Sequence, residues 1–253
     1  MIQKLLAPKV KKLITLATHI GTRYECPFCG YRSRDLAATG LNIPVIQEKH
    51  VIGAGRRNAR CHFCHSTDRE RLVYIYLKYE LKLLQDKKLK ILHLAPEKNL
   101  SIALRKARFD FYQCGDLFTE GYKYPDYVKN MNVLDIPFAD NHFDLIICNH
   151  LLEHVPSDLD AMSELYRVLK PKGKAILQVP ISKNSETTYE DFSITQPKER
   201  EAAFGKFDHV RIYGQDYTER LTSVGFTVER INISEKYEKY GLNKEEDLFI
   251  GRK

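Results

Sequence analysis

The chain lacks several features that would place it in particular classes of protein. No apolar run approaches the roughly 18 residues that span a bilayer, and the sequence has no internal repeats or low-complexity tracts. The N-terminal segment has no uninterrupted apolar stretch of the signal-peptide kind. With 43% hydrophobic and 29% charged residues among 253, the composition is that of a globular protein. We expect it to be cytoplasmic, with no transmembrane segment.

Residues 1–21 predict a basic amphipathic helix. Lysines occur there with apolar residues at helical spacing, at Lys4, Lys9, Lys11 and Lys12. Such a helix can make weak contact with an anionic membrane surface, although packing on its own domain is the favoured interpretation. The net charge of +7 is spread along the chain. It permits an RNA or another anionic partner without pointing to one.

Four of the six cysteines form two C-x-x-C pairs, Cys26 with Cys29 and Cys61 with Cys64. Two such pairs can offer four thiolates to Zn²⁺ in a tetrahedron. Without an export signal, paired cysteines are more often metal ligands than disulfides. A redox role is the alternative, but the presence of a second pair favours structural zinc. The 31 residues between the pairs exceed the usual roughly 15–20, so an insertion is expected to bulge out.

The rest of the chain is organised around this cysteine module, which we place at residues 22–66. Residues 67–87 predict a connecting helix that begins with a capping box, Thr67-x-x-Glu70. From 88 to 253, short apolar runs alternate with helical patterns, which indicates βαβ units. Predicted strands cover 90–94, 109–114, part of 130–136, 143–149, 174–180, 226–233 and 247–253, and predicted helices cover 99–107, 158–170 and 215–225.

This alternation predicts an α/β fold with a doubly wound, mostly parallel sheet and helices on both faces. The run 143–149 is apolar enough to be covered on both sides, and the single cysteines Cys114 and Cys148 are predicted to be core residues. Ligands of such sheets bind beyond the carboxyl ends of the strands, at the switch point. Asn149 and His150 follow a strand directly, so we predict that they lie at this edge.

His150, Glu153 and His154 match H-x-x-E-H, the zinc motif of one peptidase class. That motif needs both histidines on one face of a continuous helix. Here His150 follows a strand directly, and Pro156 restricts the residue before it away from the helical conformation. A candidate third ligand, Glu229, lies within a strand pattern. The sequence therefore argues against a metallopeptidase.

The segment DIPFADNHFDLIICNHLLEHVPSDLDAMSELYRVLKPKGKAILQVP resembles strands four and five of class I S-adenosylmethionine-dependent methyltransferases. DHVRIYGQDYTERLTSVGF resembles the region before their strand six, and the resemblance covers about residues 88–253. With CPFCG and RRNARCHFCHSTDRERL ahead of this domain, the whole chain is similar to a bacterial subgroup with an N-terminal cysteine module. The resemblance implies a seven-stranded Rossmann-like methyltransferase sheet after a small zinc-ribbon-like module. It also implies S-adenosylmethionine as cofactor and structural Zn²⁺.

The resemblance assigns cofactor-binding roles to residues at the strand ends. Asp116 would accept hydrogen bonds from the ribose hydroxyls, as an acidic residue at this position does in dinucleotide folds. Asp135 and Ile136 correspond to the adenine-contacting position. A solvated turn aspartate and a helix or turn cap are the structural alternatives. Asn149 and His150 complete the predicted cofactor edge.

The first loop departs from the methyltransferase pattern. His93, Ala95, Pro96 and Glu97 stand where an acidic residue and glycines are expected, although the subgroup shares this APE turn. Glycines allow close backbone approach to a cofactor, so their absence leaves a weakened cofactor site as an alternative. Glu97 is predicted to bind the ammonium group of the cofactor.

The acceptor side is predicted between the strands 174–180 and 226–233. His209 is the best candidate for a base because its ordinary pKa lies near neutrality, and a structural hydrogen-bonding role is the alternative. The predicted substrate-binding residues are Tyr189, Glu190, Asp191, Arg211 and Tyr213. His209, Arg211 and Tyr213 alternate and would project together from an extended segment.

These observations predict a methyltransferase that acts on an oxygen or nitrogen of a small molecule or glycan. A zinc-ribbon RNA methyltransferase is the first alternative, because arginines near the cysteines can bind phosphate. These arginines are Arg56, Arg57, Arg60, Arg69 and Arg71. A non-catalytic interaction protein on a disabled methyltransferase fold is the second alternative, motivated by the missing glycines.

Overall fold

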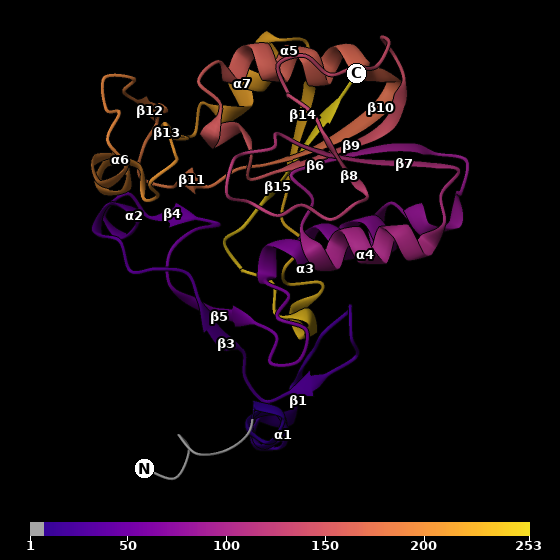
Figure 1. Cartoon of the computed structure of the whole chain (residues 1–253), viewed down its shortest axis with the longest axis vertical. Helices are drawn as coiled ribbons and strands as arrows, with labels where there is room; N and C mark the ends of the chain where they lie inside the picture. Colours follow the sequence, from indigo (N-terminus) through magenta and orange to yellow (C-terminus); the bar gives the residue numbers. More distant parts are fainter. Residues whose placement is uncertain (1–7) are drawn as a thin grey trace.

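The computed structural model describes residues 8–253 and contains one large α/β body with a smaller cysteine-bearing module below it (Figure 1). The body is built on a seven-stranded sheet of order β14-β15-β10-β9-β6-β7-β8. These strands are β6 Lys90–Leu94, β7 Phe111–Asp116, β8 Val128–Asn130, β9 Phe143–Asn149, β10 Leu169–Gln178, β14 Thr227–Ile231 and β15 Leu248–Arg252. Strand β15 is antiparallel to both neighbours, whereas β6 to β10 pair in parallel. The predicted Rossmann-like sheet is therefore confirmed as a mixed sheet.

Helices cover both faces of the sheet (Figure 1). They are α3 Asp68–Ile75 and α4 Lys98–Ala107 on one face, and α5 Asp158–Val168 and α7 Tyr217–Ser223 on the other. Strand β9 shows why a continuous apolar run suits this position. Leu145 and Ile147 enter the core on the α3–α4 side, whereas Ile146 and Cys148 enter the core on the α5–α7 side. Cys114 and Cys148 are buried, as predicted.

The sheet has its switch point between β6 and β9. From β6 the chain moves outward to β7 and β8, and it then returns to the other side of β6 to form β9. The strands on the two sides of this point are wound in opposite directions, which leaves a crevice outside their carboxyl ends. The residues that follow β6, β7 and β9 therefore share one edge of the sheet.

Two local predictions differ from the structure. The third strand lies at Val128–Asn130 and overlaps the predicted range 130–136 only at Asn130, and the side chains of Met131, Val133 and Ile136 that follow it are in the core. Helix α5 ends at Val168, before the expected Pro171-Lys172-Gly173 breaker, and β10 begins at the next residue with an irregular register between 169 and 174.

The N-terminal part begins with α1 Pro8–His19, and residues 1–7 of the helix predicted over 1–21 lie outside the described range. Val10, Leu13 and Ile14 of α1 are exposed, whereas the Tyr31 hydroxyl of the module donates to the carbonyl of Leu16 and Lys12 lies over the Phe63 ring. Within the described range, none of the helices has the length and apolar character needed to cross a membrane. The module also contains β1 Ile20–Glu25 paired with β2 Arg32–Ser33, and β3 Ala37–Thr39 paired with β5 Arg57–Arg60.

The insertion between the cysteine pairs does not bulge freely into solvent. It contains α2 Pro44–Glu48 and β4 Val51–Ile52, and β4 pairs with β11 Ile181–Ser182 of the body. Ile46 and Val51 pack with Phe204 and Ile212 from the segment after β10. This segment contains α6 Pro197–Phe204, and β12 Tyr189–Glu190 paired with β13 Arg211–Ile212. The insertion therefore covers the segment predicted to bind the acceptor (Figure 1).

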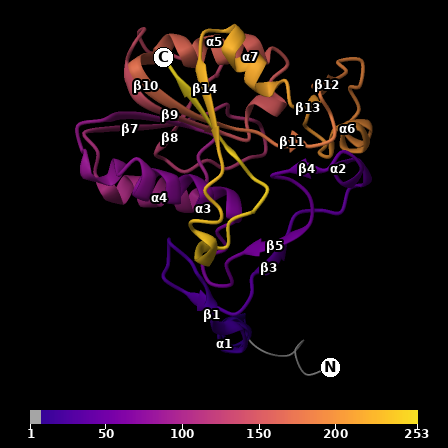
Figure 2. The same cartoon turned by 180° about the vertical axis from the view of Figure 1, so that it is seen from behind.

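The C-terminal segment joins the body to the module from behind (Figure 2). It leaves β14, forms η5 Glu238–Tyr240 beside β1 and returns as β15. The buried guanidinium of Arg71 in α3 donates to the carbonyls of Tyr240 and Gly241, and also to those of Ala59 and Ser66 in the module. The remaining short helices are η2 Tyr76–Glu80, η3 Leu83–Gln85 and η4 Leu152–His154.

Candidate functional site

The turn after β6 keeps a glycine-like conformation without a glycine. Ala95 has a φ of +45°, in the left-handed region that glycine favours. Its amide donates a 2.9 Å hydrogen bond to the carbonyl of Gly115, directly before Asp116 at the end of β7. The Ala95-Pro96-Glu97 turn and Asp116 are therefore neighbours at the carboxyl edge.

Glu97 is held at this edge by two side chains from adjacent strands. Asn149 Nδ2 donates to Glu97 Oε1 at 3.0 Å, and His93 Nε2 lies 3.0 Å from Oε2. Burial acts to raise the pKa of Glu97, but the hydrogen bonds from His93 and Asn149 outweigh it and lower that pKa. The His93 ring is fully buried, with Nδ1 2.7 Å from the Tyr112 hydroxyl. His93 therefore positions Glu97. The sequence predicted that His93 binds the cofactor, but its ring is buried and is not accessible to a ligand.

Asp116 offers the more open carboxylate. It is half-buried, and burial raises its pKa. Within residues 8–253 its carboxylate makes no hydrogen bond or ion pair to another side chain, and a backbone hydrogen bond from Leu117 acts to lower its pKa. Asp135 is exposed near the same edge, whereas the Ile136 side chain is in the core and its amide donates to Glu164 at 3.0 Å. Asp116 and Asp135 are accessible to a ligand, and Ile136 is not.

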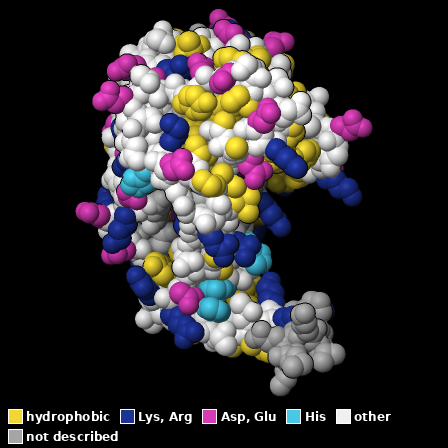
Figure 3. Space-filling model, turned by 90° about the vertical axis from the view of Figure 1, so that its left-hand side faces the viewer, with side chains coloured by type: hydrophobic (Ala, Val, Ile, Leu, Met, Phe, Trp, Pro, Cys, Tyr) yellow, Lys and Arg dark blue, Asp and Glu magenta, His cyan; other side chains and the backbone are white. Residues whose placement is uncertain are grey.

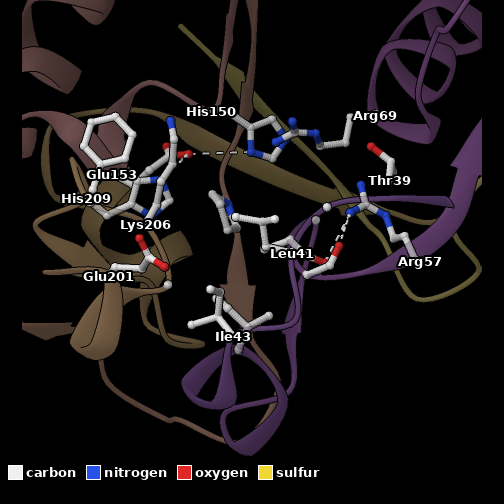
Figure 4. A pocket seen from close by; sticks show the side chains of 18 of the residues that line it. Thr39, Leu41, Ile43, Arg57, Arg69, His150, Glu153, Glu201, Lys206 and His209 are labelled. Carbon is white, nitrogen blue, oxygen red and sulfur yellow. Dashed lines mark hydrogen bonds and ion pairs between the residues drawn. The ribbon is translucent and has the colours of Figure 1, made fainter. Parts of the chain in front are cut away.

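A cavity of about 380 Å³ lies between the insertion and the body (Figure 4). His150 contributes to it from the predicted cofactor edge, whereas Glu97 and Asp116 lie outside its lining. Its walls come from both parts of the chain, and they include Thr39, Leu41, Ile43, Arg57 and Arg69 on one side and His150, Glu153, His154, Glu201, Lys206 and His209 on the other. A space of this size suits a small ligand or one group of a larger ligand.

The predicted acceptor residues do not act as one group. His209 lines the cavity, and burial lowers its pKa to about 4. Arg211 is fully buried and donates to the carbonyls of Leu152, Val155 and Pro156 and to Glu190. The buried Tyr213 hydroxyl donates to Asp158 at 2.8 Å. Arg211 and Tyr213 are occupied inside the protein, which corrects the prediction that they bind substrate.

The first polar cluster of the acceptor segment is partly accessible. Tyr189 is exposed and packs on Phe204, and Glu190 is bound to Arg211. The Asp191 carboxylate accepts hydrogen bonds from Ser193. In the part of the chain that the structure describes, the residues that line the cavity do not include Tyr189, Glu190 or Asp191.

Sequence reasoning missed the group formed by Glu153 with His154 and His209. Glu153 is 2% exposed and lies where η4 meets β13. Burial acts to raise its pKa, but the neighbouring histidines lower it to about 2. His150 has a φ of +52° and lies outside η4, so the two histidines of the H-x-x-E-H string do not share a helix, as predicted. The pairing with His209 joins residues 56 positions apart, and spacing along the chain gave no signal for it.

The four paired cysteines converge. Cys26 Sγ lies 3.5 Å from Cys64 Sγ, and Cys29 Sγ lies 3.7 Å from Cys61 Sγ. These separations are close to the edge of about 3.8 Å of a zinc–thiolate tetrahedron and far longer than a disulfide bond. Both turns have a left-handed residue four positions after the first cysteine, Gly30 and His65. The four sulfur atoms lie within 4.8 Å of one another, close enough to surround one metal ion.

Two of the five arginines near the cysteines are occupied by groups of the protein, whereas Arg56 and Arg60 are exposed. Arg71 is buried and bound to carbonyl groups, and Arg57 is paired with Asp68. On the face seen in Figure 3, Lys and Arg side chains are interspersed with Asp and Glu. This distribution gives less support to the RNA alternative than the sequence did.

The doubly wound, mixed sheet is Rossmann-like, and Glu97, Asp116 and Asp135 lie near its carboxyl edge. Residues 117–177 match the family model described as a methyltransferase domain. The matched stretch runs from the end of β7 through β8, β9 and α5 into β10, so it includes the central part of the sheet.

Individual relatives match over parts of their length. Over 66 residues the chain is 47% identical to the protein MJ0638 of Methanocaldococcus jannaschii, covering 25% of this chain and 28% of that protein. Over 115 residues it is 30% identical to the ubiquinone/menaquinone biosynthesis C-methyltransferase UbiE of Rickettsia felis, covering 46% and 42%. The chain thus spans less than half the length of these two relatives. A solved S-adenosylmethionine-dependent methyltransferase from Archaeoglobus fulgidus aligns with 73% of this chain and 94% of its own, at 14% identity and a TM-score of 0.48.

Proposed function

We propose that the chain is an S-adenosylmethionine-dependent methyltransferase whose acceptor enters the cavity between the insertion and the body. The observation that carries the proposal is the carboxylate of Asp116, which has no side-chain partner within residues 8–253 and stands beside the switch point of a doubly wound sheet. A ribose diol has two hydroxyl donors that such a carboxylate can accept.

The cofactor residues divide by what they contact. Asp116 would accept from the ribose, Asp135 would accept from the adenine amine, and Glu97 would bind the ammonium group. His93 and Asn149 fix the Glu97 carboxylate through their hydrogen bonds. The Ala95-Pro96 turn replaces the glycine-rich loop. The left-handed conformation of Ala95 supports a loop that can still approach the cofactor closely. When bound, S-adenosylmethionine supplies an electrophilic methyl group.

The acceptor is best matched by a small molecule or a glycan unit with an oxygen or nitrogen nucleophile. The cavity volume of about 380 Å³ lies in the range of small-ligand sites. His150 lies both at the cofactor edge and on the cavity wall, which supports transfer from one space to the other. His209 is the predicted acceptor-side residue that lines this cavity.

The cysteine cluster is proposed to hold structural Zn²⁺. Its sulfur separations of 3.5 and 3.7 Å support a tetrahedral site with no open position, and such sites contribute folding energy to small modules. Ser66, which lies 3.4 Å from Cys26 Sγ and 3.3 Å from Cys64 Sγ, would stabilise the thiolates.

The function is tested by incubating the full chain with S-adenosylmethionine labelled in its methyl group and separated small-molecule, glycan, RNA and protein fractions of bacterial cells. Label in the small-molecule or glycan fraction, lost with Glu97→Gln, supports the proposal. Label in RNA alone replaces it with the RNA alternative. Absence of label in every fraction, together with absence of cofactor binding, supports the non-catalytic alternative.

A further inference from the structure

One wall of the cavity brings together two imidazoles and a carboxylate. One ligand atom from each of Glu153, His154 and His209 lies within 4.8 Å of the others, and Figure 4 shows Glu153 and His209 beside each other on this wall. Glu153 is 2% exposed and His209 is 7% exposed. Burial of this kind distinguishes the cluster from charged groups that meet by chance on a surface.

The contacts of Glu153 leave room for a bridging atom. Its Oε1 lies 4.0 Å from His209 Nε2 and 3.6 Å from His150 Nδ1, both beyond hydrogen-bond length. Its Oε2 is buried and has no hydrogen-bond partner within residues 8–253. A buried carboxylate without donors is costly, and a cation placed among these atoms would remove that cost.

Neighbouring groups hold the cluster in the arrangement that a metal site needs. His154 Nδ1 lies 3.4 Å from Asp208 Oδ2, which resembles the carboxylate–histidine pairing that leaves the other ring nitrogen free for a metal. Arg211 binds the carbonyls of Leu152 and Val155 on either side of the Glu153-His154 dipeptide. The ligand groups therefore stand on a fixed frame.

We propose that Glu153, His154 and His209 bind one divalent transition-metal ion at a site separate from the four cysteines. Two imidazoles and one carboxylate are a known ligand set for Zn²⁺ and Fe²⁺, with positions left open. All three residues line the cavity, so the open positions face the space assigned to the acceptor. This role toward the acceptor rests on the proposed function. A metal ion at this position would favour an acceptor whose hydroxyl or keto oxygen binds the ion. His209 would then be a metal ligand and not a base.

The test counts zinc. The full chain is equilibrated with Zn²⁺, freed of unbound metal by gel filtration and analysed for zinc per chain, with no S-adenosylmethionine present. Glu153→Gln and His209→Gln are the site variants. His19→Gln is the matched control, because His19 belongs to a second group with Asp35 and His62 that could also take a metal. Circular dichroism establishes that each variant is folded.

The wild type and His19→Gln are expected to hold one more zinc than either site variant. Asp208→Asn is expected to weaken the additional zinc by about 10- to 100-fold, the usual effect of losing an outer-shell carboxylate. Co²⁺ bound at this position should show no thiolate-to-cobalt charge-transfer band. Equal zinc in the wild type and the site variants would overturn the proposal, as would an additional zinc lost only with His19→Gln. Because no cofactor is present, failure of the proposed function leaves this result unchanged.

Discussion

At the scale of single residues, the left-handed backbone conformation of Ala95 shapes the turn at the proposed cofactor edge. Its left-handed φ of +45° costs an alanine roughly 1–2 kcal/mol relative to the right-handed region. Glycine would remove that cost but would also gain freedom in the unfolded chain, worth roughly 0.5–1 kcal/mol. The turn therefore holds Ala95 in a strained backbone conformation that a glycine would adopt without strain.

Ala95→Gly is expected to leave the free energy of unfolding unchanged or raise it by up to about 1 kcal/mol. Ala95→Val is expected to lower it by about 1–3 kcal/mol, because a β-branched residue is poorly accommodated at positive φ. Urea unfolding measures both. Equal stability of the valine variant and the wild type would show that the turn relaxes to another conformation.

Glu246 is a buried carboxyl whose Oε2 has no partner within residues 8–253. Burial, aided by Asp68, raises its pKa from an ordinary 4.5 to about 8, although Arg69 and Arg57 act against the shift. Between these values the folded state holds a proton that the unfolded state has lost. The stability of the protein therefore falls as pH rises from 4.5 to 8 through this group.

Glu246→Gln is expected to remove that pH dependence. At pH 8 the variant should exceed the wild type in unfolding free energy by on the order of 1–3 kcal/mol, and the difference should shrink at pH 5. The neighbouring, more exposed Glu245→Gln is the control, and it should change stability little. Parallel pH profiles for Glu246→Gln and the wild type would contradict the raised pKa.

At the scale of elements, Arg211 of β13 fixes the turn that follows β9. Replacing it with lysine leaves buried carbonyls and Glu190 without matched donors, since an ammonium cannot reproduce the guanidinium geometry. Arg211→Lys should lower the free energy of unfolding by about 3 kcal/mol, whereas the exposed Arg252→Lys should change it little. Unchanged stability with weakened acceptor binding would restore the substrate role predicted from the sequence.

The docking of α2 on α6 closes one side of the cavity. Ile46→Ala removes a buried side chain shared by both elements, and it should reduce the local stability of residues 43–55 by about 2–4 kcal/mol. Hydrogen exchange of the amides in β4 and β11 measures this loss. Leu41→Ala, at an exposed residue of the same insertion, should leave their protection as in the wild type. Equal protection in Ile46→Ala would show that the insertion is held by other contacts.

At the scale of the whole molecule, the regular part of the fold follows from local pattern. The apolar run of β9 and the alternation from residue 88 onward predicted the sheet, since strands buried on both faces have a distinct composition. The insertion was different. Residues 43–55 have little periodicity, and their partners at 181–182 and 204–212 are far away in the chain. Their docking is a long-range packing event that leaves no local trace.

The candidate site, like the fold, was predictable from the sequence where it depends on strand order and not where it depends on long-range packing. Glu97, Asp116 and Asn149 end neighbouring strands, so topology alone brings them to one edge. Arg211 and Tyr213 failed because alternation indicates which residues share a side of an extended segment but not whether that side faces solvent or the interior. His209 and Glu153 meet through the same tertiary packing that buries Arg211.

The central claim is that the carboxyl edge binds S-adenosylmethionine through Asp116. The most direct measurement is a calorimetric titration of the folded full chain with S-adenosylhomocysteine, on the wild type, Asp116→Asn and Asp110→Asn. Asp110 is an exposed aspartate just before the opposite end of the same strand. We predict one-to-one binding to the wild type and Asp110→Asn, weakened roughly tenfold or more in Asp116→Asn. Absence of binding to the wild type, or equal binding to all three proteins, would contradict the account.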